Sequence, residues 1–140
     1  MTLARNEFLL PKGWPRPRGY SNGVRVPAGQ DLVLTGGMIG WDATEKLVPG
    51  GFAAQFEQAL RNVLCVVAEA GGGPANIVRM TVYVVSREQY LASLGELGAA
   101  WSRTMGRVYP AMALVEVSGL VEPGALVEIE GTAAVPPAAS

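Results

Sequence analysis

Residues 109–120 (YPAMALVEVSGL) and 126–135 (LVEIEGTAAV) are two runs typical of β-strands, joined by the turn sequence VEPGA at 121–125. In the second run small or apolar residues alternate with Glu128, Glu130 and Thr132, which predicts a strand with one buried and one polar face. The two carboxylates repel each other unless solvent or a cation compensates, or one is protonated. The strand is therefore either a solvated edge or the wall of a polar site.

The rest of the chain predicts strands alternating with two helices. The first helix is expected to have Gln55 on its solvent side and to end at the glycines 71–73, and the second is expected to begin at a Ser86 cap and end at Gly106. The order is β-β-α-β-α-β-β, an α/β (α+β) fold with two helices on one face of a mixed sheet. Upstream of the two runs, the expected elements are strands at 24–26 and 31–35 paired as a hairpin, a helix at 52–70, a strand at 77–85 and a helix at 87–105.

The opposite face of this sheet has no predicted cover. Met112 and Leu114 are expected on it, beside the carboxylates, and other strands also have apolar residues for both faces. A monomer would expose this surface, which favours an oligomer.

The length of 140 residues and a hydrophobic content of 49% predict one globular domain. We expect an extended, proline-rich N-terminal arm at 1–18, the domain at 19–135 and a flexible tail at 136–140. Trp14 is interpreted as an anchor of the arm on the domain or on a neighbouring subunit.

Composition excludes several classes of protein. The chain has no histidine and a lone cysteine, Cys65, which is expected to be buried; this excludes His-dependent hydrolases, His-ligated zinc and internal disulfides. No metal or cofactor is predicted, and the glycine runs lack the pattern of a nucleotide-binding loop. The net charge of -1 offers no field to attract nucleic acid. Without a run of ~20 apolar residues, no membrane contact and a cytoplasmic location are expected.

A series of short motifs follows one another along residues 19–135. They are Gly19-Tyr20, Gly23, LTGGMIG at 34–40, AAQFEQALRNV at 53–63, Ala70-Gly71, IVRMTVYV at 77–84, Pro110-Ala111, VEV at 115–117, Leu120 and VEIE at 127–130. In their order and spacing, these motifs resemble the RidA/YjgF family of reactive imine and enamine deaminases. The resemblance implies a chorismate-mutase-like fold and a homotrimer in which three sheets form a barrel-like centre and small molecules bind in clefts between subunits.

The chain departs from this family at the position after Pro110-Ala111. Deaminating members have an arginine there, whose guanidinium clamps the substrate carboxylate, whereas this chain has Met112. Four other positions that are polar or reactive in the family are small or apolar here, namely Gly36, Met38, Leu94 and Leu114. Together these changes predict a drier and larger pocket, suited to an apolar or aromatic ligand. Alternatively, the same side chains pack a subunit interface.

The resemblance assigns catalytic roles to Tyr20 and Glu128, which in relatives help to aim a water at the imine carbon. It also places the Gly37 backbone in the site, although a β-bulge would explain Gly36-Gly37 equally well. The other predicted substrate-binding residues are Met38, Trp41, Leu94, Met112 and Leu114. Alternatively, Glu128 forms an ion pair with Arg25, Arg103 or Arg107 of a neighbouring subunit.

Two functions stay open. The first is a divergent deaminase-type hydrolase of imines or enamines that lack a carboxylate near the reacting carbon. The second is a trimeric ligand-binding or regulatory protein without catalysis. Ribonuclease activity, suggested by an older family name, is disfavoured because the chain lacks histidine and a basic patch.

Overall fold

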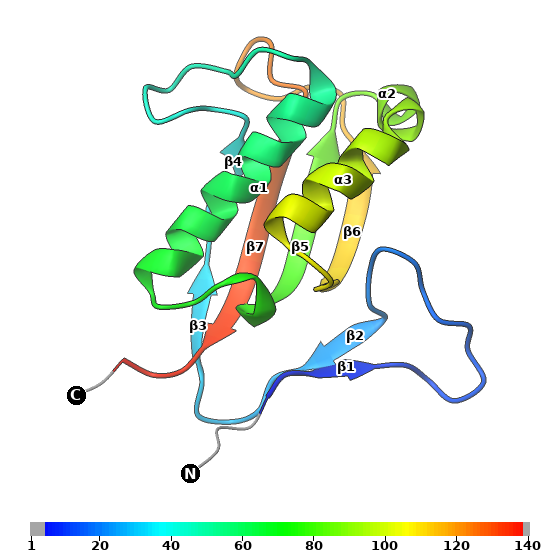
Figure 1. The fold of residues 1–140 in the computed structure, drawn as a ribbon, viewed down its shortest axis with the longest axis vertical. Helices are drawn as coiled ribbons and strands as arrows, with labels where there is room; N and C mark the ends of the chain where they lie inside the picture. Colours follow the sequence, from blue (N-terminus) through cyan, green and yellow to red (C-terminus); the bar gives the residue numbers. More distant parts are fainter. Residues whose placement is uncertain (1–4, 139–140) are drawn as a thin grey trace.

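The structure, a computed structural model, describes residues 5–138. Its main sheet is mixed, with the order β3-β7-β5-β6, and β4 also pairs with β7. The strand β7 is antiparallel to β3, β4 and β5, whereas β5 and β6 are parallel. The last strand of the chain is thus central in the sheet (Figure 1). The strands of this sheet are β3 (Asp31–Leu34), β4 (Met38–Ile39), β5 (Ile77–Val84), β6 (Ala111–Glu116) and β7 (Val127–Val135).

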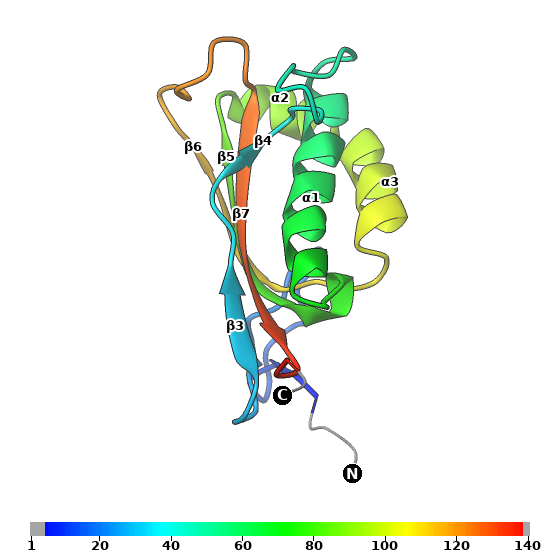
Figure 2. The same ribbon diagram turned by 90° about the vertical axis from the view of Figure 1, so that its left-hand side faces the viewer.

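Within the described residues, three α-helices lie on one face of the sheet, and the other face has no helix (Figure 2). The predicted first helix is α1 (Phe52–Glu69). It ends before Gly71, whose φ angle of 81° lies in the left-handed region that favours glycine. The predicted second helix forms two pieces, α2 (Arg87–Ala92) and α3 (Leu94–Thr104). Ser86 caps α2 as predicted, its Oγ accepting from the Gln89 N–H at 3.0 Å. The predicted helix is interrupted between α2 and α3 at Ser93, whose Oγ donates to the Gln89 carbonyl at 2.8 Å. A short 3-10 helix, Pro74–Asn76, precedes β5.

The predicted two faces of β7 are confirmed. Val127, Ile129 and Ala133 are fully buried against the helices, while Glu128 and Glu130 are half-buried on the helix-free face. A Cβ atom at position 131 would lie 3.1 Å from Val63 Cγ1, so glycine there allows α1 to pack close to the strand.

The expectation that Met112 and Leu114 share a face with the carboxylates is wrong. In the parallel register Met112 lies opposite Met80 and Leu114 opposite Val82, and both of these β5 residues are fully buried beneath the helices. Met112 and Leu114 therefore pack at the margin of the core, on the helix side of β6. The register of β6 with β5 sets this orientation, and the β6 sequence alone does not reveal it.

Two residues of α1 differ from their expected exposure. Gln55 is 6% exposed because its amide is bonded to the turn before β7: Nε2 donates to the Gly124 carbonyl at 3.1 Å, and Oε1 accepts from the Leu126 N–H at 2.9 Å. Cys65 is exposed, since it lies on the side of α1 away from the sheet.

The predicted hairpin of 24–26 with 31–35 does not form. Instead, β2 (Gly23–Arg25) pairs with β1 (Glu7–Leu9) of the N-terminal arm in a separate two-stranded sheet, while β3 pairs with β7. Trp14 of this arm is 60% exposed, so it does not anchor the arm on the domain of the same chain. No helix within residues 5–138 is long and apolar enough to cross a membrane.

An ion-pair cluster joins the two long helices. Glu57 of α1 accepts from Arg103 of α3 and from Arg61, each with a shortest N–O distance of 2.6 Å. The hydrogen bonds from Arg103 and then Arg61 lower the pKa of the Glu57 carboxyl below its ordinary value. The ionised cluster therefore stabilises the fold above the ordinary carboxyl pKa, and this contribution is lost as pH falls through the lowered folded pKa.

We predict that Glu57→Gln lowers the melting temperature at pH 7 by a few degrees, because the ion pairs are partly solvent-exposed. The difference from the parent should shrink as the pH falls below the ordinary carboxyl pKa and through the lowered pKa of the folded state. Calorimetric melting from pH 7 down into the acid range measures both effects. Glu69→Gln is the control, since Glu69 is an exposed α1 residue with no ion pair within residues 5–138. Equal melting temperatures of the parent and Glu57→Gln at pH 7 would contradict the assignment.

Candidate functional site

Glu128 lies against the backbone of the segment that links β3 to β4. Residues 35–37 stand opposite only Gly131 and Glu130, so the segment forms a bulge, held by hydrogen bonds in both directions between Thr35 and Gly131. A Cβ atom at Gly37 would lie 2.8 Å from Glu128 Cδ, whereas one at Gly36 would meet nothing within 4 Å. The bulge and the close approach, which are alternatives in the sequence, thus occur together.

A cleft of 270 Å³ opens beside Glu128. It brings together Gly37, Met38, Trp41 and Glu128, four of the predicted site residues. The helix α1 and the turn before β7 also supply lining residues. The lining residues that were not predicted from the sequence are Ile39 of β4, Asn62 of α1, and Val121 and Glu122 of the turn.

Asn62 of α1 holds this wall in place. Its Nδ2 donates to the carbonyls of Ile39 and Trp41, both at 2.9 Å, while its Oδ1 accepts from Gln58. Gly40 lets the same segment approach the helix, because a Cβ atom there would lie 2.7 Å from Gln55 Cα. The sequence signal for this role is Asn62 itself, a polar residue within the AAQFEQALRNV motif.

The two carboxylates of β7 have different partners. Glu130 accepts a hydrogen bond from the Tyr83 hydroxyl at 2.8 Å. This bond, together with burial and the negative charges of Glu130 and Glu128, raises the pKa of Tyr83. Glu128, by contrast, has no hydrogen bond or ion pair within residues 5–138. It is therefore the carboxylate available to a ligand or to a water in the cleft.

Two of the arginines considered as partners of Glu128 are engaged within the same chain. Arg25 lies 3.6 Å from Glu7, and Arg103 lies 2.6 Å from Glu57. Arg107 has no ion pair within the described residues. Of the three candidates, Arg107 is thus the cation without a competing intrachain partner.

A second cleft, of 360 Å³, lies between α3 and β6 and contains the predicted residues Leu94, Met112 and Leu114. Its walls are mostly apolar and aromatic. Trp101 and Tyr109 stack there with ring centroids 6.1 Å apart and an angle of 3° between the rings. This cleft is separate from the Glu128 cleft, with which it shares no residue.

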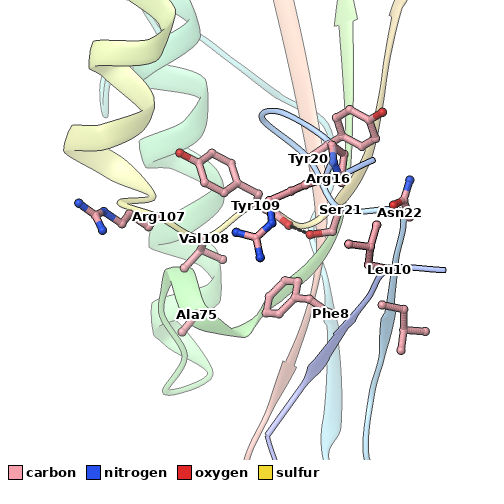
Figure 3. A pocket seen from close by; sticks show the side chains of 12 residues that line it. Phe8, Leu10, Arg16, Tyr20, Ser21, Asn22, Ala75, Arg107, Val108 and Tyr109 are labelled. Atoms are coloured by element: carbon pink, nitrogen blue, oxygen red, sulfur yellow. Dashed lines mark hydrogen bonds between the residues drawn. The ribbon is translucent and has the colours of Figure 1, made fainter. Parts of the chain in front are cut away.

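Tyr20 lines a third cleft, of 330 Å³, between the arm and the segment that leads into β6 (Figure 3). Beside it, Ser21 fixes the chain: its N–H donates to the Pro110 carbonyl at 3.0 Å and its Oγ to the Tyr109 carbonyl at 2.5 Å. In one chain, therefore, the predicted site residues occupy three places rather than one. Within residues 5–138 no group of three cysteine, aspartate or glutamate side chains forms a metal site.

Known proteins are similar to this chain in sequence. The model of the Endoribonuclease L-PSP family matches residues 15–135. The protein DfrA of Myxococcus xanthus is 32% identical over 114 residues, which are 81% of this chain and 83% of DfrA. A 2-iminobutanoate/2-iminopropanoate deaminase of Bos taurus is 30% identical over 115 residues, which are 81% of this chain and 78% of the deaminase.

Solved structures of proteins from this family are also similar to the chain. YyfB of Yersinia pestis, described as a Rid-family protein of unknown function, matches with a TM-score of 0.81 and 28% identity over 94% of this chain and 100% of YyfB. Rv2704 of Mycobacterium tuberculosis, of the YjgF/YER057c/UK114 family, matches with a TM-score of 0.60 and 33% identity over 84% of this chain and 88% of Rv2704. Because the family match spans most of the chain and the fold agrees, this protein belongs to the RidA/YjgF family.

Proposed function

We propose that the protein hydrolyses the C=N bond of a small imine, formed directly or from an enamine, with Glu128 as the proton acceptor. The observation that carries this proposal is the Glu128 carboxylate, which is unpartnered within residues 5–138 and lies against the Gly37 backbone in a cleft. A carboxylate can move protons between water and substrate, so the absence of histidine is no obstacle. Relatives named as iminobutanoate and iminopropanoate deaminases support the same reaction type.

In this reaction, Glu128 takes a proton from water as the water oxygen bonds to the imine carbon. The electron pair of the C=N bond moves to nitrogen, which receives that proton. The resulting carbinolamine then loses its nitrogen: the hydroxyl proton passes through Glu128 to nitrogen, the C–N bond breaks, and a carbonyl forms. For an unsubstituted imine the products are a ketone or aldehyde and ammonia.

The full site is proposed to form between copies of the chain in a homotrimer. The Glu128 cleft lies at the β4 side of the sheet and the Met112 cleft at the β6 edge, so a head-to-tail contact would join the two halves, and three such contacts can close a ring. The helix-free face supports assembly, because Leu32 is 59% exposed and Leu34 is 71% exposed on it.

The Met112 half of the site favours an apolar or aromatic substrate. Leu94, Met112 and Leu114 offer no group that could clamp a carboxylate next to the reacting carbon. The replacement of the family arginine by Met112 also favours the second candidate function, a trimeric protein that binds such ligands without turnover. Glu128 distinguishes the two, since only hydrolysis needs its basicity.

We predict that Glu128→Gln lowers kcat at least about 100-fold, because the amide cannot accept the water proton. The assay would follow ammonia release from aryl imines generated in situ by an amine oxidase. The variant should keep the parent's melting temperature and assembly. Glu130→Gln is the control: its amide oxygen can still accept from Tyr83, so turnover should persist. An unchanged kcat in Glu128→Gln would refute the catalytic role, and parent protein that binds imines without releasing ammonia would favour the binding function.

A second prediction uses the two neighbouring glycines. Gly37→Ala should displace the Glu128 side chain and reduce turnover with little change in melting temperature, because the new methyl group meets a side chain that can move. Gly36→Ala should leave turnover unchanged, since its methyl group would enter open space. Steady-state kinetics of both variants measure the effect. If both substitutions behave alike, the contact between Gly37 and Glu128 has no functional part.

The third prediction concerns assembly. Light scattering at micromolar concentration should give three times the 14.7 kDa chain mass. A monomeric or dimeric mass would contradict the proposed site between subunits.

A further inference from the structure

The cleft between α3 and β6 contains a charged residue to which no role has been assigned, Arg18. The described residues that line this cleft include no carboxylate, and Arg18 is the charged side chain among them. Arg18 also has no ion pair or hydrogen bond within residues 5–138. An unpaired guanidinium beside an apolar cleft is a binding group for an anion. The apolar and aromatic residues around it are Phe56, Tyr90, Leu94, Leu97, Trp101, Tyr109, Met112 and Leu114.

The sequence around Arg18 restricts where its guanidinium can go. Pro17 fixes its own φ angle and disfavours a helical conformation of Arg16, so the preceding arm stays extended. Gly19, with a φ of 80°, turns the chain toward Ser21, which forms a parallel bridge with Ala111 and hydrogen bonds to the segment before it. Arg18 is thus tethered three residues from a fixed point that adjoins Met112.

We propose that Arg18 binds the anionic group of the ligand, and that this ligand is a small acid with an aromatic or apolar body. Arg18 is exposed and Met112 is half-buried, so the carboxylate would lie at the open end of the cleft and the body against Met112. The ligand carboxylate is then remote from the part of the ligand that lies against Met112. This agrees with the replacement of the family arginine, which would clamp a carboxylate there, by Met112. The inference rests on the proposed function only in treating this ligand as the substrate. The test below measures ligand binding and needs no turnover.

Arg16 supplies a matched control on the same arm. It lines the neighbouring cleft, and Figure 3 shows its guanidinium pointing into that cleft, among Phe8, Val108 and Tyr109. Arg16 and Arg18 have the same charge and lie two residues apart, but they line different cavities. If only the charge of the arm mattered, replacing Arg16 and replacing Arg18 would weaken anion binding equally. If Arg18 itself binds the anion, only the replacement of Arg18 would weaken it.

The test compares the binding of phenylacetate and of its uncharged amide, phenylacetamide, by titration calorimetry. The parent protein should bind phenylacetate at least about tenfold more tightly than the amide, since a hydrogen-bonded charge pair contributes roughly that much. Arg18→Gln should abolish this preference and Arg16→Gln should retain it. Arg18→Lys, which keeps the charge but loses the bidentate geometry, should give an intermediate preference. Melting curves would establish that each variant is folded.

The proposal would be overturned if the parent bound the acid and the amide with equal affinity. It would also be overturned if phenylacetate did not bind at 10 mM, a concentration about ten times a millimolar Kd. An equal loss in Arg16→Gln and Arg18→Gln would also overturn it. So would an Arg18→Gln protein that keeps the acid preference but dissociates into smaller species, because Arg18 would then pair with a neighbouring subunit. An acid preference that depends on Arg18, in a protein whose Glu128→Gln variant has unchanged turnover, would reject the proposed catalysis while keeping this site.

Discussion

Strand β7 is paired along both of its edges, and this pairing sets the positions of the helices, the bulge and the two carboxylates. Because β5 lies on one side and β3 and β4 on the other, β7 must present one face to α1 and the other to the helix-free side. Its alternating residues satisfy this requirement: the apolar residues are fully buried, and the absence of a side chain at Gly131 leaves room for Val63 of α1. The carboxylates on the opposite face then follow from the period of the strand.

The same arrangement determines which of the two carboxylates of β7 has a hydrogen-bond partner. Tyr83 is held in register beside Glu128, but its hydroxyl reaches Glu130, so Glu130 has a partner and Glu128 has none within residues 5–138. The bulge at 35–37 brings a glycine backbone to Glu128, and Asn62 fixes the following segment to α1. Glu128, the proposed proton acceptor, is thus positioned by a strand, a bulge and a helix, which are more rigid than loops.

Charge is distributed unevenly between the clefts. The Glu128 cleft contains Glu122 and Glu128 and no cation, whereas the cleft at β6 contains Arg18 and no carboxylate among the described residues. In the proposed head-to-tail contact these groups would serve different parts of one ligand, Arg18 its anionic group and Glu128 its reacting carbon. The support for assembly itself is the exposed leucines of β3.

The elements with local signals could be predicted from the amino-acid sequence: the alternation in β7, the amphipathic α1, the Ser86 cap and the glycine ends of the helices. The family resemblance was also readable, because its motifs keep their order along the chain. The three-dimensional fold was needed to establish that β2 pairs with β1, that Met112 faces the helices, and that Gln55 is buried by hydrogen bonds to a distant turn. It also separated the predicted site residues into three clefts and placed Arg18 in the same cleft as Met112. These features depend on strand register and on contacts between residues far apart in sequence, and a local pattern of residues carries no record of either.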